Sequence, residues 1–278
     1  MTERAAARLA TLLVALAACA AVGRFVAAHY YSLYDDGFIY LRYVQQLHAG
    51  CGLRFNCHDA RVEGVTSPLF LGLLALGSAL SSRWLTLAQV LCALPLAAAI
   101  ALAARAAAGS REVPVAQRAA GALAVLAVLA LDDYALLNSV TGLETALGAA
   151  LVTGAYLAAR SERYVAAGWC AGLAFLVRPE AGILVAALPV MPGARRAGVL
   201  GPAWGIVLGA TALRLALFHD VVPNTFWVKS GGSSAHLALG VAYLGRTLRD
   251  FPAVLLVLLA PFAPRAGLRR AGAWRRPA

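Results

Sequence analysis

The stretch WLTLAQVLCALPLAAAIALAA, residues 84–104, is the part of the sequence that decides the fold class. It contains no charged side chain, and a helix that crosses a membrane needs about 20 consecutive apolar residues. A helix is favoured because a segment in lipid must satisfy its own backbone hydrogen bonds. The stretch therefore predicts a transmembrane helix.

Further apolar runs lie on both sides of this stretch. They cover residues 9–28, 67–82, 117–131, 142–159, 164–177, 180–193, 197–218 and 251–263. Hydrophobic residues make up 61% of the 278 residues and charged residues 13%, whereas a soluble domain carries about 25% charged residues. The sequence predicts an all-α, polytopic membrane protein in which residues 1–278 form a single transmembrane domain.

The formal net charge of +11 comes from 24 basic residues, all of them arginine except Lys229. They lie between apolar runs and do not form one basic face, so no nucleic-acid partner is expected. Because basic residues favour the cytoplasmic side of a membrane, the arginine clusters indicate the topology. The clusters are Arg4/Arg8, Arg105/Arg111/Arg118, Arg160/Arg163, Arg195/Arg196 and Arg265/Arg269/Arg270/Arg275/Arg276.

All five clusters can face the cytoplasm only if one of the three apolar runs between Arg8 and Arg105 does not cross the membrane, and the short run 67–82 is the best candidate. We expect an interfacial or re-entrant helix there, about eight crossings, and both termini inside. The outer segments then become 29–83, 132–141, 178–179 and 219–250, on the extracytoplasmic face of a bacterial inner membrane. Residues 1–23 also read as a cleaved signal peptide, but the apolar stretch continues to Ala28, which favours a retained first helix.

The five cysteines predict no metal site. Cys19, Cys92 and Cys170 lie in apolar runs, where packing is their expected role. Cys51 and Cys57 share the first outer loop, in CGLRFNC, and in an oxidising compartment they either pair or stay free. No His or Cys spacing resembles a zinc site. No cofactor is evident in the sequence, and a divalent metal is left open.

The first outer loop holds the richest set of polar residues. Asp35 and Asp36 begin a stretch in which Phe38, Ile39, Leu41, Val44 and Leu47 recur at helical spacing. This pattern predicts an amphipathic helix on the membrane surface with both carboxylates in its first turn. The two carboxylates either complement the helix dipole or serve catalysis, and one Asp would be enough for capping.

Three further outer segments carry candidate residues. Asp132 and Asp133 end one run and are followed by TGLETAL, which contains Glu144. In LVRPEAG, Pro179 interrupts an apolar run, and Arg178 either binds a phosphate through its planar fork or pairs with Glu180. PNTFWVKSGGSS holds the only lysine, beside aromatic residues that suit an anionic, sugar-bearing ligand. Carboxylates and cations on one side of the membrane favour an outward-facing transferase that uses a lipid-linked phosphate donor.

The segments resemble, in order, the polyprenyl-phosphate-sugar-dependent glycosyltransferases of the GT-C class, most closely the bacterial terminal arabinofuranosyltransferase-like group. They are DDGFIYLRYVQQLHAGCGLRFN with VEGVTSPLF, then TGLETAL, LVRPEAG and PNTFWVKSGG. The first is the most specific, because an Asp pair followed by this helix and an EG-x-T-x-P turn rarely arises by chance. The others are weak individually, and their order carries most of the resemblance.

The resemblance implies many transmembrane helices, with the first outer loop folded over the site. It also implies inverting transfer of an arabinofuranosyl or hexosyl group from a polyprenyl-phosphate donor, such as decaprenyl-phospho-arabinose, to a cell-envelope glycan or glycolipid. Asp35 would be the general base, and Asp36 would support it or position the acceptor. The expected substrate-binding residues are Glu63, Thr66, Glu144, Arg178, Glu180, Asn224 and Lys229, with Arg178 and Lys229 at the donor phosphate.

The sequence departs from the group in two ways. Relatives continue with further spans and often a soluble domain, whereas this chain ends at Arg-Arg-Pro-Ala, and the Cys51/Cys57 pair is not typical of the group. A transporter or flippase for lipid-linked saccharides is an alternative, but such proteins usually show internal repeats and charges at the membrane midplane. A non-catalytic membrane subunit is a second alternative, which the short length favours.

Overall fold

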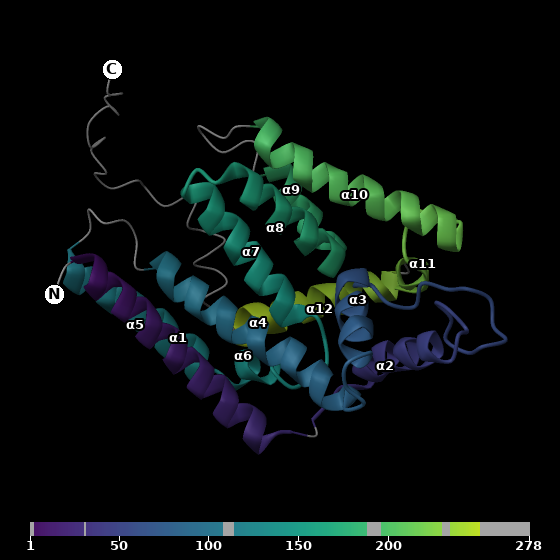
Figure 1. Cartoon of the computed structure of the whole chain (residues 1–278), viewed down its shortest axis with the longest axis horizontal. Coiled ribbons are helices and arrows are strands. Elements are labelled where there is room, and N and C mark those ends of the chain that lie inside the picture. The colour runs from purple at the N-terminus through teal and green to yellow at the C-terminus, as the bar shows by residue number, and fades with distance from the viewer. Residues whose placement is uncertain (1–2, 31, 108–113, 188–195, 230–233, 251–278) are drawn as a thin grey trace. The chain divides into compact units, whose positions relative to one another are not determined.

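A computed structural model describes residues 3–30, 32–107, 114–187, 196–229 and 234–250, which form helices joined by loops, with no strand among them. The predicted all-α class is therefore confirmed. The helices, drawn in Figure 1, are α1 (Glu3–Ala28), α2 (Asp35–His48), α3 (Pro68–Ser78), α4 (Trp84–Ala107), α5 (Val115–Leu131), α6 (Asp133–Leu137), α7 (Thr145–Arg160), α8 (Tyr164–Val177), the 3-10 turn η1 (Pro179–Ala181), α9 (Gly182–Ala187), α10 (Arg196–Phe218), α11 (Asn224–Lys229) and α12 (Ser234–Asp250).

The chain divides into two compact units, residues 1–227 and 228–278. In the second unit, α12 is the main described element, and its apolar side chains Leu237, Leu239 and Tyr243 are exposed. The contacts of the candidate site described below all join residues of the first unit.

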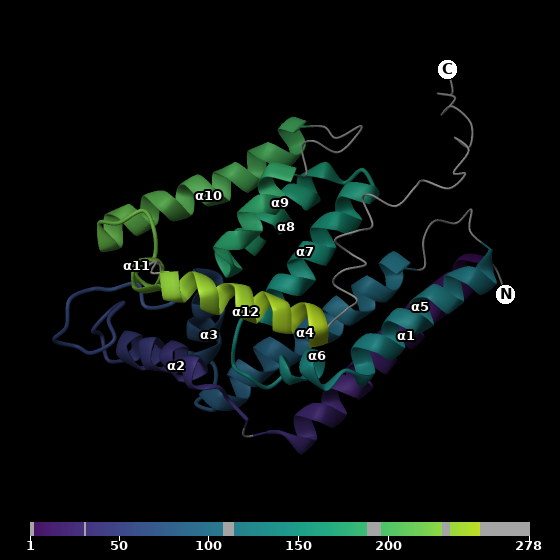
Figure 2. The ribbon, with the colours of Figure 1, turned by 180° about the vertical axis from the view of Figure 1, so that it is seen from behind.

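Helix α4 lies among α1, α5 and α7, and it packs against all three. Both ribbon views show α1 and α5 side by side (Figures 1 and 2). The buried cluster here joins Ala18 and Val22 of α1 to Leu96 and Ile100 of α4. Close packing of these apolar side chains gives van der Waals attraction between the two helices.

Helices α7, α8 and α10 form a second packed group through small residues. A Cβ atom at Gly168 of α8 would lie 2.5 Å from the carbonyl oxygen of Val199 of α10, a distance that no side chain permits. Ala167, Ala171 and Ala203 are fully buried in the same contact. Small residues allow helix backbones to approach closely, as they do in membrane bundles.

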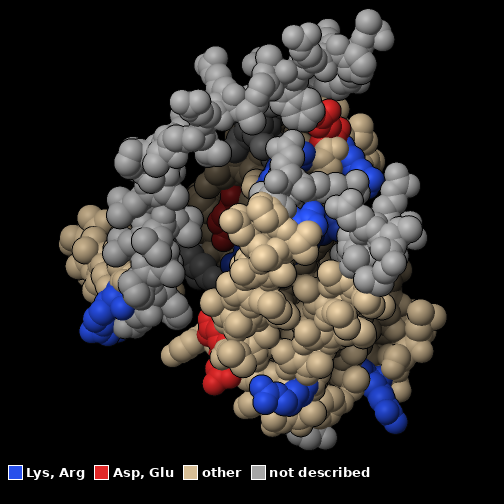
Figure 3. Space-filling view, turned by 90° about the vertical axis from the view of Figure 1, so that its left-hand side faces the viewer, with Lys and Arg blue, Asp and Glu red and all other residues tan. Residues whose placement is uncertain are grey.

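Among the described residues, two helices are long and apolar enough to cross a membrane by length and composition, Trp84–Ala107 and Ala197–Phe218. Shorter apolar helices cover Leu12–Ala28, Pro68–Ser78, Val115–Leu131 and Tyr164–Val177. Much of the described surface is uncharged, and Figure 3 shows the charged side chains as scattered groups on the face in view. The predicted number of crossings therefore stays a prediction.

Several helix boundaries differ from the sequence prediction. The run 67–82 forms a helix only to Ser78, and the run 180–193 begins as a 3-10 turn followed by the short α9. Residues 219–250, predicted as an outer segment, contain α11 and α12. The predicted run 251–263 lies outside the described residues, as does the end of the run 180–193.

The predicted amphipathic helix begins at Asp35 as expected. Val44 of the predicted apolar set is buried together with Tyr40 and Tyr43, whereas Phe38 is half-exposed. The two tyrosines are amphipathic, so their rings pack inward while their hydroxyl groups bond to polar partners.

Candidate active site

The first turn of α2 packs against the turn that carries the TGLE motif. The backbone N–H of Tyr34 donates to the carbonyl oxygen of Thr141 at 3.0 Å. A Cβ atom at Gly37 would lie 3.0 Å from that same carbonyl oxygen, so glycine allows the two backbones to meet. The Asp pair and the TGLE motif, predicted as separate parts of one site, therefore lie side by side.

Asp35 and Asp36 are exposed in the first turn of α2. The helix is preceded by Tyr34, whose side chain makes no capping hydrogen bond. The Asp35 carboxylate accepts a hydrogen bond from the Asp36 backbone N–H at 2.9 Å. Two carboxylates near a helix N-terminus are stabilised by its dipole, and their exposure leaves both accessible to a ligand.

Glu144 is a buried carboxylate that joins three of the predicted segments. It accepts a hydrogen bond from the hydroxyl group of Tyr40 at 3.0 Å, and its other oxygen lies 3.3 Å from Nη2 of Arg178. The same nitrogen donates to the hydroxyl oxygen of Thr145 at 3.1 Å. Only 4% of the Glu144 side chain is exposed, against 43% for Arg178. Arg178 therefore compensates the buried charge and still reaches the surface.

The local backbone explains how Arg178 reaches this position. Helix α8 ends at Val177, and Arg178 is extended because the following Pro179 disfavours a helical conformation for the residue before it. Nη1 of Arg178 lies 3.7 Å from a carboxylate oxygen of the exposed Glu180. Arg178 thus makes the predicted pair with Glu180, and it also pairs with Glu144, which the sequence did not indicate.

Tyr40 is held in its neutral form by its surroundings. Burial raises the pKa of the Tyr40 phenol, and the adjacent Glu144 carboxylate raises it further. Hydrogen bonds with the Thr66 side chain and the Ser67 backbone lower this pKa, but by less. The EG-x-T-x-P segment therefore lies beside the same phenol. Tyr40 is therefore a permanent hydrogen-bond donor to Glu144.

We expect Tyr40→Phe to lower the free energy of unfolding by about 1.5–3 kcal/mol, the usual worth of a hydrogen bond to a charged group. A raised pKa in the folded state means that only the unfolded chain loses this proton as the pH rises past the ordinary tyrosine pKa of 10.0. The contribution of the Tyr40 hydroxyl group to the free energy of unfolding is therefore complete below about pH 10 and declines above it. Denaturant unfolding of both proteins between pH 7 and 11 measures the loss and its slope.

The control for this variant is Tyr243→Phe, since Tyr243 is exposed on α12. It should change neither stability nor its dependence on pH. If Tyr40→Phe unfolds at the same denaturant concentration as the wild type, the hydroxyl group does not support Glu144.

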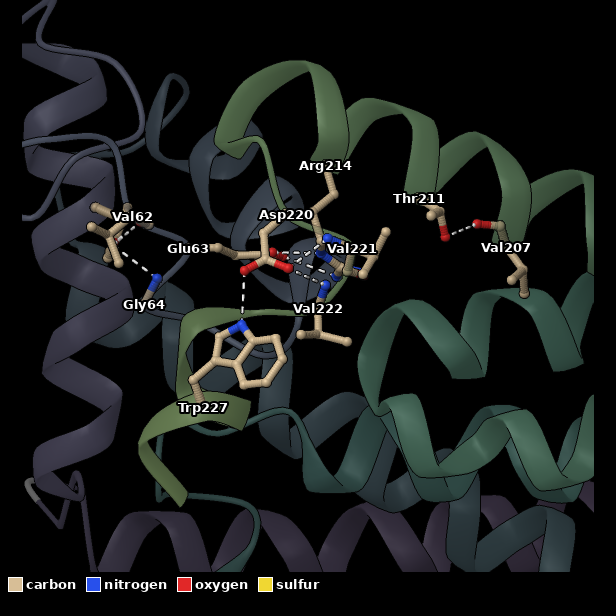
Figure 4. Close-up of polar contacts among 11 residues, drawn as sticks. Val62, Glu63, Gly64, Val207, Thr211, Arg214, Asp220, Val221, Val222 and Trp227 are labelled. Atoms are coloured by element: carbon tan, nitrogen blue, oxygen red, sulfur yellow. Dashed lines mark hydrogen bonds and ion pairs between the residues drawn. The ribbon is translucent and has the colours of Figure 1, made fainter. Parts of the chain in front are cut away.

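A second cluster forms around Glu63, the acidic residue of the EG-x-T-x-P turn. Both carboxylate oxygens bind Arg214 of α10, with Nε at 2.5 Å and Nη2 at 3.0 Å (Figure 4). Each side chain is only 8% exposed. The remaining nitrogen, Nη1, donates to the carbonyl oxygen of Val221 at 3.2 Å. The pair therefore fixes the turn against α10 and the loop that follows it.

The short segment 62–67 connects the two clusters. The hydroxyl group of Tyr43 donates to the carbonyl oxygen of Val62 at 2.5 Å and accepts from the backbone N–H of Gly64 at 3.0 Å. At the other end, the Ser67 hydroxyl donates to the carbonyl oxygen of Leu176 on α8 at 3.3 Å. The half-buried Thr66 thus lies between Glu63 and the Tyr40–Glu144 contact.

The last predicted segment reaches the Glu63 cluster through Trp227. Asp220 accepts hydrogen bonds from the indole N–H of Trp227 at 2.8 Å and from the backbone N–H groups of Val221 and Val222 (Figure 4). These hydrogen bonds lower the pKa of Asp220, and the one from Trp227 has the largest effect, ahead of the one from Val222. Asn224 is exposed at the start of α11, and the Lys229 side chain lies outside the described residues.

Two residues of this arrangement were missed in the sequence. Arg214 lies inside the apolar run 197–218, and an ionisable residue within such a run is a functional candidate by default. That signal was available and was not used. Tyr40 gave no comparable signal, because its role depends on the contact with Glu144, 104 residues away in sequence.

The arrangement provides two exposed carboxylates beside a buried carboxylate–arginine pair. Such a set can accept a proton at one point and hold an anion at another. Within the described residues, no group of three or more His, Cys, Asp or Glu side chains is placed to hold a metal ion. Comparison with known proteins shows no matching family model, no matching curated protein and no matching solved structure.

Proposed function

We propose that this chain is a membrane glycosyltransferase that moves a sugar from a polyprenyl-phosphate donor to a cell-envelope glycan or lipid. One observation carries the proposal: Glu144 joins the DD helix, through Tyr40, to Arg178 of the LVRPE segment. The EG-x-T-x-P turn lies beside the same phenol. Glu144, Arg178 and the EG-x-T-x-P turn, which the resemblance to GT-C transferases implies at the site, are therefore close together, and this supports the proposal.

The proposed reaction is a single displacement at the anomeric carbon of the donor sugar. An acceptor hydroxyl forms the new bond to this carbon while the bond to the phosphate oxygen breaks. Asp35 takes the proton of the hydroxyl group as general base, and Asp36 supports it or positions the acceptor. The lipid phosphate leaves with the bonding electrons as an anion, which cationic groups stabilise.

Arg178 is the best-placed cation for the leaving phosphate among the side chains described. Its guanidinium group carries five N–H donors, and the contacts with Glu144, Thr145 and Glu180 occupy only its two terminal nitrogens. The buried Glu144 fixes the group in place, which keeps it oriented before the donor arrives. Lys229 is proposed as a second phosphate contact from the sequence alone.

The first outer loop supports the proposed orientation of the site. Cys51 and Cys57 are joined by a disulfide, and disulfides persist mainly outside the reducing cytoplasm. Arg42 of α2 also binds this loop, donating to the carbonyl oxygen of Phe55 at 2.9 Å and to Asn56 at 2.8 Å. This loop directly follows the helix that the Asp pair begins, so its disulfide fits a site on the extracytoplasmic face of an inner membrane protein with about eight spans.

We expect a membrane-impermeant maleimide to label Cys51 and Cys57 in intact spheroplasts only after treatment with an impermeant reductant. The disulfide blocks both thiols until it is reduced, and the other cysteines lie in helices of the predicted spans. Labelling is followed by mass spectrometry, with the double variant Cys51→Ser/Cys57→Ser as the control that loses the signal. Labelling that requires permeabilised cells would place the Asp pair in the cytosol and remove the proposed reaction.

The function itself is tested with purified full-length protein in lipid nanodiscs. The protein is given a polyprenyl-phosphate pentose or hexose and a short glycan acceptor, and the product is followed by mass spectrometry. Transfer supports the proposal. Binding of the donor without transfer to any acceptor would instead identify a non-catalytic subunit, and movement of the donor between leaflets without transfer would identify a flippase.

A further inference from the structure

An apolar groove of about 760 Å³ lies next to the Asp pair, between the start of α2 and the start of α4. The residues that line it and carry the argument are Leu33, Phe38, Leu41, Arg83, Trp84 and Leu85. A volume of this size is within the range of small-molecule sites, which are mostly apolar with a few polar groups. Nothing in the proposed donor chemistry assigns it a role.

The groove and the Glu144 cluster lie on different sides of α2. Residues three apart on a helix are neighbours on its surface, so Asp35 lies next to Phe38, and Phe38 next to Leu41, along the side that lines the groove. Tyr40 faces Glu144 and Arg178 instead. A molecule in the groove would therefore reach the proposed base from the side away from the donor-phosphate arginine.

Two residues at the start of α4 indicate what the groove would bind. Trp84 contributes its ring to the lining of the groove. Arg83 is exposed at the rim, and its side chain forms no ion pair with any residue that the structure describes. The groove thus combines an apolar surface with a cation at its edge, which complement an amphiphile with an anionic head group.

We propose that this groove binds the acceptor, and that the acceptor is an anionic glycolipid. This inference rests on the proposed transferase function and names the class of its second substrate. The apolar chain of the acceptor lies against Phe38 and Leu85, its acidic group lies near Arg83, and the reacting hydroxyl group meets Asp35. Donor and acceptor then approach α2 from opposite sides.

The first experiment compares one acceptor sugar supplied as its methyl, hexyl and octyl glycosides. KM should fall by up to about fourfold for each methylene that enters the groove. Longer chains also partition into the nanodisc, so each variant is judged by the KM for the octyl glycoside divided by the KM for the methyl glycoside. In Leu85→Gln this ratio should rise most of the way to one, because the octyl chain loses its contact with the groove. Leu80→Gln, at a side chain 91% exposed on the loop after α3, should keep the wild-type ratio.

The anionic head group is tested with the octyl glycoside and its phosphorylated form. Arg83→Gln should raise KM for the phosphorylated acceptor several-fold and leave the uncharged acceptor unchanged. Arg163→Gln, at the exposed residue before α8, is the control and should affect neither acceptor. If Arg83→Gln leaves the KM of both acceptors at the wild-type value, the proposed charge contact is absent.

A photoreactive octyl glycoside that carries a diazirine provides a readout independent of transfer. Cross-links should map to residues 38–41 and 83–86, and octyl but not methyl glycoside should compete with them. Two results would overturn the inference and leave the proposed transferase function intact. One is cross-links that map elsewhere, and the other is an octyl-to-methyl ratio of KM in Leu85→Gln equal to that of the wild type. Loss of transfer from every donor would instead remove the proposed function, and the cross-links would still show whether the groove binds the amphiphile.

Discussion

Asp35→Asn is expected to lower kcat for sugar transfer by about 100- to 10,000-fold, the usual contribution of a general base. Asp36→Asn should lower it as well, because the neighbouring carboxylate supports the base or holds the acceptor. The amide has nearly the same size as the carboxylate and keeps an oxygen for the Asp36 backbone N–H, which now bonds to Asp35 at 2.9 Å. The loss should therefore appear in kcat and not in folding.

The geometry explains why these two exposed residues should have so large an effect. The close contact between Gly37 and the carbonyl oxygen of Thr141 fixes the first turn of α2 against the TGLE turn. One turn further along α2, Tyr40 bonds to the Glu144 carboxylate that pairs with Arg178. A sugar held between Asp35 and Arg178 would have a proton acceptor and a phosphate-binding cation on two sides, which is what an in-line displacement requires.

Initial rates are measured with saturating donor, and the folded state of each variant is checked by its unfolding midpoint. Asp59→Asn is the matched control, because Asp59 is an exposed aspartate of the same outer loop. It should transfer sugar at the wild-type rate. Normal transfer by both single variants, and by Asp35→Asn/Asp36→Asn together, would show that the carboxylates only complement the helix dipole.

The sequence was sufficient to predict the all-α class and where most of the described helices lie. The apolar run 84–104 forms α4, the run 164–177 forms α8 with the same boundaries, and the Asp pair begins α2. Hydrophobic periods and helix breakers are local properties, so they can be read along the chain. Pro179 is the clearest case, because it ends α8 and extends the Arg178 backbone where the arginine turns toward Glu144.

The partners of the site residues could not be predicted in the same way. The pair of Arg178 with Glu180 was one of two predicted roles, but its pair with the buried Glu144 was not predicted. Glu63 was assigned to the cavity lining, yet both of its oxygens bind Arg214, 151 residues away. Such pairings depend on how helices pack, which no local pattern records. Long-range polar contacts therefore need the structure, even where each residue is correctly marked as a candidate.

The Glu63–Arg214 pair gives the largest expected effect on stability. Arg214→Met should lower the free energy of unfolding by about 3–5 kcal/mol, because it leaves the Glu63 carboxylate buried without a partner. It also removes the donor to the carbonyl oxygen of Val221. Arg24→Met, at an exposed arginine of α1, is the matched control and should change stability by no more than about 0.5 kcal/mol. Chemical unfolding of the purified protein in detergent measures both.

The double variant Glu63→Met/Arg214→Met separates the cost of the unpaired charge from the value of the pair. A buried ion pair replaced by apolar residues of similar volume is often neutral or even stabilising, so the double variant should regain most of the stability that Arg214→Met loses. It should also transfer sugar, because both Glu63 oxygens already bind Arg214 and the Glu63 side chain is only 8% exposed, which leaves a substrate little access to it. A double variant as unstable as Arg214→Met would show that the pair itself fixes the turn, and a stable but inactive one would assign Glu63 to substrate binding after all.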